Sequence, residues 1–361
     1  MSIGFPMKYI KGYTNSKPGI QVGTKWQGEI KKNSDGSFTF DPDGVKFLQQ
    51  IGVEWVMVND PPAHTVAEMK QIKRQIEDMG FKVYRLANNL LHNMPQITLN
   101  LPGRDEKIDE YLQYISNMGE AGIRYSTYAH MGNGIWWDDE RRVIRGGATA
   151  RAMCLNKVNR GYWPPTGDVF NWPLSHGRKY SEAELWDNYE YFIKKVVPVA
   201  ESAGVYIGIH PDDPPGIEMA GIPRKIFGTF EGYKRAFEIA DSDHIGACLC
   251  VGCWCQGLDL VGCTPEEFIR YFGPRGRLFK VHMRNVTAPL TSPEGFSETF
   301  PDAGYYNLIN VIEALDEVEF DGVMINDHLV DIVGGHYACE AAFTSYLKGA
   351  VNAVQNHRNF L

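Results

Sequence analysis

The sequence lacks three features that would each point to a particular class of protein. It contains no block of lysine or arginine and has a formal net charge of -8 over 361 residues, so nothing indicates nucleic acid or an anionic membrane surface as a partner. No apolar run approaches the roughly 20 residues that cross a bilayer. The first residues also lack the apolar core of a signal peptide. We therefore expect a cytoplasmic protein that acts on a small, polar molecule.

The cysteines do not form the pattern of a disulfide framework. Their number is odd, seven, and five of them lie between Cys248 and Cys263. In a reducing compartment such sulfurs are free thiols or metal ligands. The stretch "CLCVGCWC" also lacks the two separated Cys-x-x-Cys pairs of a structural zinc ribbon, which argues against a four-thiolate cluster.

Short apolar runs that read as buried parallel strands alternate with stretches of helical spacing. Beside an initial strand within residues 7–24, we expect strands at 53–59, 81–87, 123–129, 204–210, 245–250, 278–283 and 322–327. Eight such repeats predict an α/β fold, a single (β/α)8 barrel domain over residues 1–361. An open doubly wound sheet is the alternative, but no glycine-rich phosphate turn follows the first strand. The aromatic segment 131–180 is interpreted as an insertion that covers the barrel mouth.

Four of the expected strands end on a side chain that can bind a metal ion. In barrel enzymes the functional groups lie at the carboxyl ends of the strands. Two imidazoles, one thiolate and one carboxylate suit a divalent Mn, Fe, Co or Zn ion. A single such residue would more often be a core residue, but four at equivalent positions favour a metal site. The expected ligands are His210, Cys250, His282 and Asp327.

Within the cysteine stretch, the alternation of a strand selects one sulfur. Cys248 and Cys250 point to the same face, but only Cys250 reaches the strand end. We expect Gly252 to let the backbone turn away and leave this sulfur facing the cavity. Cys253 and Cys255 are expected in the following loop, outside the metal site.

Three further residues are candidates for acid–base catalysis or substrate binding. Arg284, two residues after His282, would face the mouth and bind a carboxylate or polarise an oxygen. His328 follows Asp327 directly and could serve as acid or base. Tyr337 lies in the first turn of an expected helix. The alternatives are a supporting role behind the ligands for Arg284 and His328, and helix packing for Tyr337.

These residues resemble the D-mannonate dehydratase family of xylose-isomerase-like barrels. The resemblance rests on "HPDDPP" (210–215), Cys250-x-Gly252, "VHMRN" (281–285), "DH" (327–328) and "GGHY" (334–337), and it covers roughly residues 85–354. It implies one Mn2+-type ion, with Fe2+, Co2+ or Zn2+ as alternatives, held by the four expected ligands. It further implies that His328, Tyr337 and Arg284 serve as acid, base or substrate-binding groups.

The resemblance also suggests a reaction, the elimination of water from a sugar acid to give a 2-keto-3-deoxy acid. The family pattern "RPDHG" is here "INDHL", with Ile325 at the arginine and Leu329 at the glycine, while Ser297 and Pro301 stand at two family histidines and Asn307 at a family acid. An isomerase, epimerase or lyase acting on a neutral or keto sugar therefore remains an alternative. A metal-bearing barrel that only binds its ligand is a second alternative.

Substrate contacts are expected from polar and aromatic residues around the mouth. His92 resembles a substrate-contacting histidine of the family, and aromatic rings of the insertion suit stacking on a sugar. A homo-oligomer is a reasonable expectation, given the large aromatic insertion. The candidate substrate-binding residues are His92, Asn88, Asn89, Trp136 and Glu298.

Overall fold

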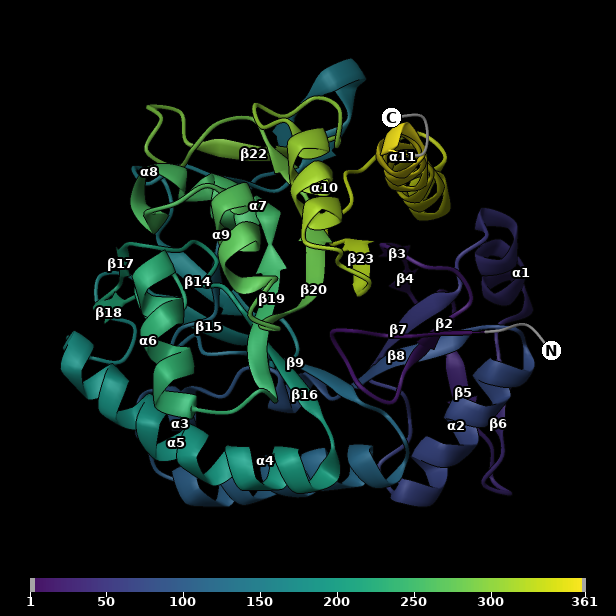
Figure 1. The fold of residues 1–361 in the computed structure, drawn as a ribbon. Helices are drawn as coiled ribbons and strands as arrows, with labels where there is room; N and C mark the ends of the chain where they lie inside the picture. The colour runs from purple at the N-terminus through teal and green to yellow at the C-terminus, as the bar shows by residue number, and fades with distance from the viewer. Residues whose placement is uncertain (1–3, 359–361) are drawn as a thin grey trace.

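Eight parallel strand positions surround one axis in the computed structural model, which describes residues 4–358 (Figure 1). The first position is split by Gly23 into two short segments. In order around the barrel the strands are β3 (Gln21–Val22) with β4 (Thr24–Lys25), β7 (Trp55–Asn59), β8 (Lys82–Ala87), β9 (Tyr125–Ala129), β16 (Tyr206–His210), β19 (Ile245–Cys250), β20 (Leu278–Met283) and β23 (Val323–Asn326).

Hydrogen-bonded ladders connect these strands nearly all the way round. One sheet has the order β4-β7-β8 and the other the order β3-β23-β20-β19-β16-β9. Since β23 pairs with β3 and β4 pairs with β7, the first position links the two sheets on one side. On the other side no ladder is described between β8 and β9, and Asn93, in the segment after β8, forms a parallel bridge with Ala129 at the end of β9. The arrangement is a (β/α)8 barrel, as the sequence predicts.

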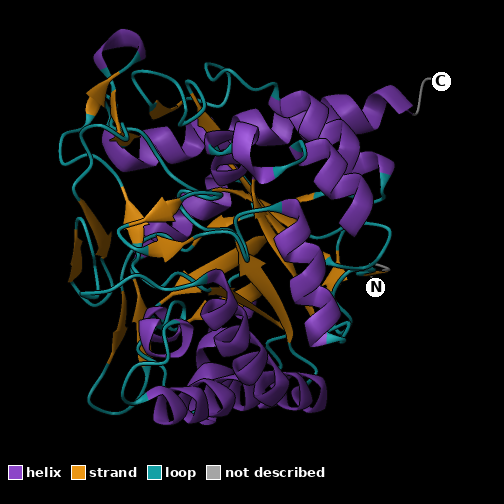
Figure 2. Cartoon of the chain, turned by 90° about the vertical axis from the view of Figure 1, so that its left-hand side faces the viewer, coloured by secondary structure: helices purple, strands orange, loops and turns teal. Residues whose placement is uncertain are grey.

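Helices cover the outside of this barrel (Figure 2). Three of them begin with a capping box: Thr65, Ser181 and Thr264 each cap free backbone N–H groups together with a glutamate three residues later. Apolar residues at helical spacing, such as Met69, Ile72 and Ile76, face the strands. The long outer helices are α1 (Pro42–Ile51), α2 (Val66–Asp78), α4 (Arg104–Glu120), α5 (Glu182–Ala203), α6 (Phe230–Ala240), α9 (Pro265–Phe272), α10 (Leu308–Glu317) and α11 (Gly335–Arg358).

The aromatic insertion forms short strands on one side of the barrel. A three-stranded antiparallel sheet contains β10 (Ile135–Trp136), β14 (Arg160–Trp163) and β15 (Asp168–Asn171), and β11 (Arg142–Val143) pairs with β12 (Thr149–Ala150). The next strand, β13 (Ala152–Met153), pairs with β22 (Phe296–Thr299) in the loop that follows β20. The insertion therefore packs on a loop from a distant part of the sequence and brings its own side chains towards the mouth.

The remaining elements are short and connect the barrel units. A short helix, α7 (Val251–Gln256), starts directly after β19, and α8 (Leu258–Val261) follows it. The others are β1 (Phe5–Pro6), β2 (Thr14–Asn15), β5 (Ile30–Lys32), β6 (Phe38–Phe40), η1 (Asn89–Leu91), α3 (Pro95–Thr98), η2 (Arg145–Gly147), β17 (Glu218–Met219), β18 (Ile222–Pro223) and β21 (Asn285–Val286).

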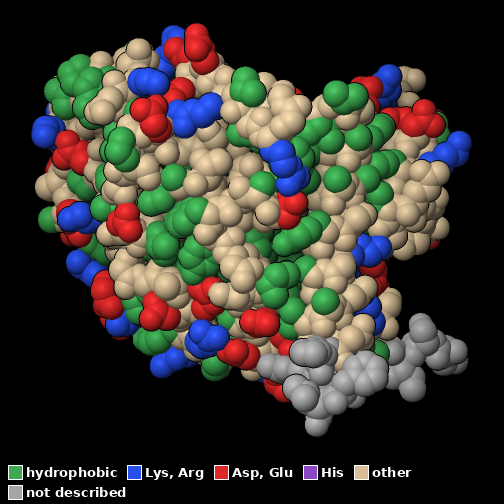
Figure 3. Space-filling model, turned by 90° about the horizontal axis from the view of Figure 1, so that it is seen from above, with side chains coloured by type: hydrophobic (Ala, Val, Ile, Leu, Met, Phe, Trp, Pro, Cys, Tyr) green, Lys and Arg blue, Asp and Glu red, His purple; other side chains and the backbone are tan. Residues whose placement is uncertain are grey.

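Within residues 4–358, no helix has the length and apolar character needed to cross a membrane. On the face seen in Figure 3, acidic and basic side chains are interspersed among hydrophobic ones.

Candidate metal centre and active-site cavity

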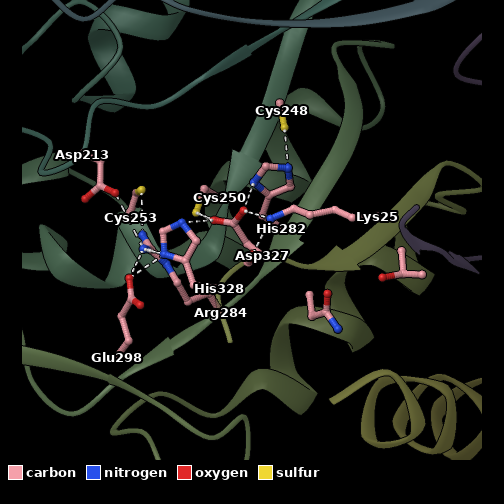
Figure 4. A network of polar contacts seen from close by, with 12 residues as sticks. Lys25, Asp213, Cys248, Cys250, Cys253, His282, Arg284, Glu298, Asp327 and His328 are labelled. Carbon is pink, nitrogen blue, oxygen red and sulfur yellow. Dashed lines mark hydrogen bonds and ion pairs between the residues drawn. The ribbon is translucent and has the colours of Figure 1, made fainter. Parts of the chain in front are cut away.

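The four expected metal ligands come together at the carboxyl ends of four adjacent strands. His210 ends β16, Cys250 ends β19, His282 lies near the end of β20 and Asp327 follows β23. One ligand atom from each residue lies within 4.8 Å of the others, which makes the set a group that could hold a metal ion. We call these four residues the metal group. Figure 4 shows three of them, Cys250, His282 and Asp327, with the polar side chains around them.

The hydrogen bonds of the two histidines leave one ring nitrogen of each free for a metal ion. Nδ1 of His210 lies 2.7 Å from the backbone oxygen of Pro211, and because a carbonyl only accepts, Nδ1 carries the proton and Nε2 keeps its lone pair. Nε2 of His282 lies 3.5 Å from Sγ of Cys248. Nδ1 of His282 is buried without a hydrogen-bond partner and faces Asp327 Oδ1 at 3.4 Å. An unpartnered buried nitrogen beside a carboxylate is the geometry that a cation would complete.

The electrostatics of the metal group favour the anionic forms of Cys250 and Asp327, and despite burial the neighbouring anions in turn raise the pKa of His210 and raise that of His282 to about 10. Burial alone would raise the pKa of Cys250, but the hydrogen bond with Cys253, the charge of Arg284 and the two imidazoles lower it well below its usual value. Likewise, His328, His282 and Lys25 outweigh burial and lower the pKa of Asp327. A thiolate and a carboxylate beside two imidazoles match the donor set expected for a divalent transition metal. The residues present therefore fit such an ion.

A second group of charged residues, the ion-pair cluster, lies beside the metal group. It consists of Arg151, Asp213, Arg284 and Glu298. Arg151 Nη2 lies 2.8 Å from Asp213 Oδ2 and 2.6 Å from Glu298 Oε1, and Arg284 Nη1 lies 2.6 Å from the same glutamate oxygen. The side chains are 1–12% exposed, so two cations and two anions neutralise one another away from water.

His328 connects the ion-pair cluster with the metal group. Its Nδ1 lies 2.6 Å from Glu298 Oε1 and 2.7 Å from Arg284 Nη1, and its Nε2 lies 3.4 Å from Asp327 Oδ2. When Nδ1 carries the proton and donates it to the Glu298 carboxylate, Nε2 keeps a lone pair beside the metal group. An imidazole held in this way is placed to accept a proton from a bound molecule.

A cavity of about 180 Å3 opens onto the metal group and His328. This is smaller than the roughly 300–1,000 Å3 of pockets for drug-sized ligands, so it suits a small molecule. Its walls combine three of the metal-group residues with cations, amides and a few apolar side chains. The lining includes Lys25, Asn59, Arg85, Asn89, His92, Ile135, Trp163, His210, Asp213, Lys280, His282, Ile325, Asp327 and His328.

The structure brings two of the expected substrate-binding residues to this cavity. His92 lines it, with Nδ1 2.9 Å from the Thr127 carbonyl and its ring stacked on Trp163 at 5.7 Å between centroids. Burial and the charge of Arg85 lower its pKa well below the usual value, so His92 is a neutral imidazole. Asn89 also lines the cavity, although its side chain donates to the Asp60 carboxylate.

Other expected contacts lie elsewhere. Asn88 caps the short helix η1 by accepting from Leu90 N at 3.0 Å, and it is not among the described residues that line the cavity. Trp136 is fully buried and donates from Nε1 to the Asn133 carbonyl at 3.1 Å, which corrects the expectation that its ring is open for stacking on a sugar. Trp163, from the same three-stranded sheet, lines the cavity instead of Trp136. Glu298 reaches the site, but as a member of the ion-pair cluster.

Arg284 and Tyr337 also differ from the expectations. The Arg284 guanidinium is enclosed by Glu298, His328 and the sulfur of Cys253, which lies 2.9 Å from Nη2, and among the described residues it does not line the cavity. Both terminal nitrogens of this buried arginine have protein partners, which favours a positioning role over binding of a substrate carboxylate. The Tyr337 ring is 38% exposed and stacks on Phe47 of α1 at 4.5 Å, outside the cavity lining.

The cysteine stretch needs two corrections. Cys253 and Cys255 lie in helix α7, not in a loop, because the chain turns directly from β19 into this helix. Gly252 does not act through a special backbone conformation. A Cβ at this position would lie 2.1 Å from Arg284 Nε and 2.8 Å from its Cβ and Cγ, so the glycine makes room for the arginine side chain.

The sequence patterns do not single out several charged residues that lie at the cavity or beside it. Arg151 comes from the insertion, and only its tertiary partners reveal it. Lys25, Arg85 and Lys280 line the cavity, and burial lowers the pKa of Lys280 to about 7. The available signal was a charged residue in the middle of an apolar strand, as in "VYRLA" and "LFKVHM".

The fold and this site define a class, the xylose-isomerase-like barrels with a candidate metal centre at the mouth. Solved structures of this type resemble the chain over most of its length: an L-ribulose 3-epimerase matches with a TM-score of 0.58 at 11% identity, over 94% of this chain and 99% of the other, which shows the fold alone.

Residues 40–159 and 164–359 match the family model of D-mannonate dehydratase, and the chain belongs to this family. The mannonate dehydratase of Streptococcus pneumoniae is 32% identical over 298 residues, which cover 77% of this chain and 75% of the other. That of Thermotoga neapolitana is 29% identical over 314 residues, 78% and 84% of the two chains. The crystal structure of mannonate dehydratase from Streptococcus suis serotype2 matches with a TM-score of 0.77 and 26% identity, over 95% of both chains.

These matches confirm the sequence-based prediction of the fold, the family and a dehydratase-like enzyme. The roles of the individual site residues stay predictions.

Proposed function

We propose that this protein is a metal-dependent dehydratase that eliminates water from a six-carbon or similar sugar acid to give a 2-keto-3-deoxy acid. The observation that carries the proposal is the convergence of four ligand atoms within 4.8 Å beside the Nε2 of His328, in a chain of the D-mannonate dehydratase family. D-mannonate is the first substrate to test, because the relatives carry that name.

The metal group would hold one divalent ion, Mn2+ in the first instance, with Fe2+, Co2+ and Zn2+ as alternatives. His210 would contribute Nε2 and His282 its unpartnered Nδ1, together with the sulfur of Cys250 and the carboxylate of Asp327. When bound, such an ion supplies positive charge that stabilises the enediolate formed as the proton α to the carboxylate leaves.

His328 serves as the base in this proposal. Glu298 accepts from Nδ1 and holds the ring, so that Nε2 takes the α proton of the substrate. The imidazolium formed in this step then protonates the departing β-hydroxyl, and the enol product tautomerises to the 2-keto-3-deoxy acid. Tyr337, whose ring lies on Phe47, remains the alternative acid from the family resemblance.

Positioning falls to the ion-pair cluster and the cavity wall. Arg284 and Arg151 hold Glu298, and through it His328, while the neutral imidazole of His92 and the amide of Asn89 offer hydrogen bonds to hydroxyl groups. We propose that the segment 131–180, which supplies Arg151 and Trp163, covers the mouth of a single barrel domain and excludes water from it.

The test is anaerobic purification with added Mn2+, followed by NMR of a panel of aldonic acids and neutral sugars in deuterated water. A 2-keto-3-deoxy acid from D-mannonate or a stereoisomer, absent after metal removal, would support the proposal. Deuterium entering a neutral or keto sugar while every acid stays unchanged would overturn it in favour of an isomerase or epimerase. No change in any compound would favour the binding-only alternative.

A further inference from the structure

The cavity contains more positive than negative charge. Three cationic side chains line it, Lys25 from β4, Arg85 from β8 and Lys280 from β20, and the carboxylates in its wall are Asp213 and Asp327. β8 and β20 are the third and seventh strand positions, so Arg85 and Lys280 reach the interior from opposite sides of the barrel. Both residues are buried, at 7% and 2% exposure.

The two carboxylates already have cationic partners. Asp213 pairs with Arg151 at 2.8 Å, inside the ion-pair cluster. Asp327 belongs to the metal group, and Lys25 lies 3.6 Å from its Oδ1 and 2.6 Å from its backbone oxygen. The close cationic partners of the two acids are therefore Lys25 and Arg151, and neither acid forms an ion pair with Arg85 or Lys280.

Neither Arg85 nor Lys280 forms an ion pair with a described residue, although the charges of Cys248 and Asp327 act on Lys280 from beyond ion-pair distance. Arg85 Nη2 contacts the Nδ1 of His92 at 3.1 Å and the Thr127 carbonyl at 3.5 Å, both uncharged, and its Nε is buried without a hydrogen-bond partner. Lys280 forms neither a hydrogen bond nor an ion pair with a described residue, although its side chain lines the cavity. Buried charges normally have a counter-ion, because an isolated one costs several kcal/mol.

Their position relative to the metal group is also informative. Lys280 lies two residues before His282 on the same strand, so both side chains point into the barrel, about 6.6 Å apart along β20. A small molecule that contacts Lys280 and Arg85 at one end can therefore reach the metal group and His328 with the next carbon atoms.

We infer that Arg85 and Lys280 form the carboxylate-binding subsite of this enzyme and thereby select acids over neutral sugars. This inference rests on the proposed function, since it names the residues that recognise the acid end of the substrate. The fork of the Arg85 guanidinium and the amino group of Lys280, whose protonated form a bound carboxylate favours, bind the carboxylate oxygens. The hydroxyl-bearing carbons extend towards the metal group and Nε2 of His328.

Binding without turnover tests the inference. Isothermal titration calorimetry of the metal-free protein, in which the proposed dehydration does not proceed, compares D-mannonate and D-gluconate with D-mannitol and D-glucitol, which carry an alcohol in place of the carboxylate. We expect the wild type to bind each acid at least about 10-fold more tightly than its alcohol. Arg85→Gln and Lys280→Met should each weaken acid binding by about 10- to 100-fold, the range for one charge-assisted hydrogen bond, and leave alcohol binding unchanged.

Matched variants separate recognition from damage to the fold. Arg85→Lys and Lys280→Arg keep the charge and should keep most of the preference, and Lys195→Met, which removes a charge from a 40% exposed side chain, should not alter it. A wild type without preference for acids, or a preference that persists in both neutralised variants, would overturn the inference. If a variant does not fold, the comparison of acid and alcohol binding by the wild-type protein still tests the inference.

The outcome is separable from that of the proposed function. A preference for acids that depends on Arg85 and Lys280, without formation of a 2-keto-3-deoxy acid, would leave the subsite standing and reject the dehydration. Dehydration of an acid, together with an unchanged preference for acids in the variants, would support the proposed function and reject the carboxylate-binding subsite.

Discussion

The metal group and the ion-pair cluster lie side by side, yet they differ in how their charges are satisfied. In the ion-pair cluster, Arg151 and Arg284 face Asp213 and Glu298 at hydrogen-bond distance, and the charges neutralise within the protein. In the metal group, Nδ1 of His282 is buried and unpartnered, and ligand atoms of four side chains face one point. The first arrangement holds residues in place, and the second is completed by something that the chain does not supply.

The largest effect should follow from removing a metal ligand. A Cys250→Ser variant is expected to lose its metal and at least about 100-fold in activity. Even the mutation of a residue that only hydrogen-bonds to a metal ligand typically lowers metal affinity or activity by about 10- to 100-fold. Cys253→Ser and Cys255→Ser are the matched controls and should keep their metal, because neither residue belongs to the metal group. Metal analysis of the purified variants decides; equal loss in all three would indicate a cluster of thiolates instead.

Breaking the ion-pair cluster should act on stability before it acts on metal binding. Glu298→Gln leaves Arg151 and Arg284 buried with one carboxylate between them, which is expected to lower the free energy of unfolding by about 3–5 kcal/mol. Urea denaturation measures this loss, and metal content should stay at the wild-type level. The exposed Glu294→Gln provides the control. An unchanged free energy of unfolding in Glu298→Gln would contradict the view that the ion-pair cluster stabilises the fold while the metal group binds the ion.

A smaller change tests the contact between helix α7 and Arg284. Gly252→Ala places a methyl group on the Arg284 side chain and should cost about 1–3 kcal/mol of stability, with activity lowered by the displaced arginine and metal retained. Gly349→Ala in α11, where a Cβ meets nothing within 4 Å, should instead be neutral or stabilising. Thermal unfolding and turnover of both variants give the comparison; equal behaviour would refute the packing role of Gly252.

Tyr337→Phe should have the smallest effect. Its ring stacks on Phe47 outside both groups, and the substitution preserves this contact, so we expect most of the turnover to remain. Steady-state kinetics with the metal content fixed is the measurement. A loss of about 100-fold or more, typical of a missing acid or base, would restore the catalytic role that the family resemblance implies.

The two groups also differ in how far the sequence predicts them. Each metal-group residue lies at or near the end of an apolar strand, and the expected strands 245–250 and 278–283 have the same bounds as β19 and β20. The apolar pattern of each strand and the position of the residue at the strand end therefore suffice to predict the metal group. Arg151 lies in an insertion without a period, and its partners Asp213 and Glu298 are 62 and 147 residues away, so only the tertiary fold brings them together.

Other differences come from side-chain direction, which a single sequence does not encode. Arg284 was expected at the mouth, but the space above Gly252 lets it turn into the ion-pair cluster. Trp136 was expected on the cavity surface, whereas its ring is fully buried and lies against Gly161, its partner in the pairing of β10 and β14, where the missing side chain leaves room for it. The expectations of a homo-oligomer and of a cytoplasmic location stay predictions.

The most direct test of this account is a crystal structure of the protein grown with Mn2+, with anomalous scattering to locate the ion. The account predicts one ion bound by Nε2 of His210, Sγ of Cys250, Nδ1 of His282 and the carboxylate of Asp327, with Cys248 and Cys253 outside its coordination. An ion held by several of the cysteines, or no ion at these four residues, would contradict it.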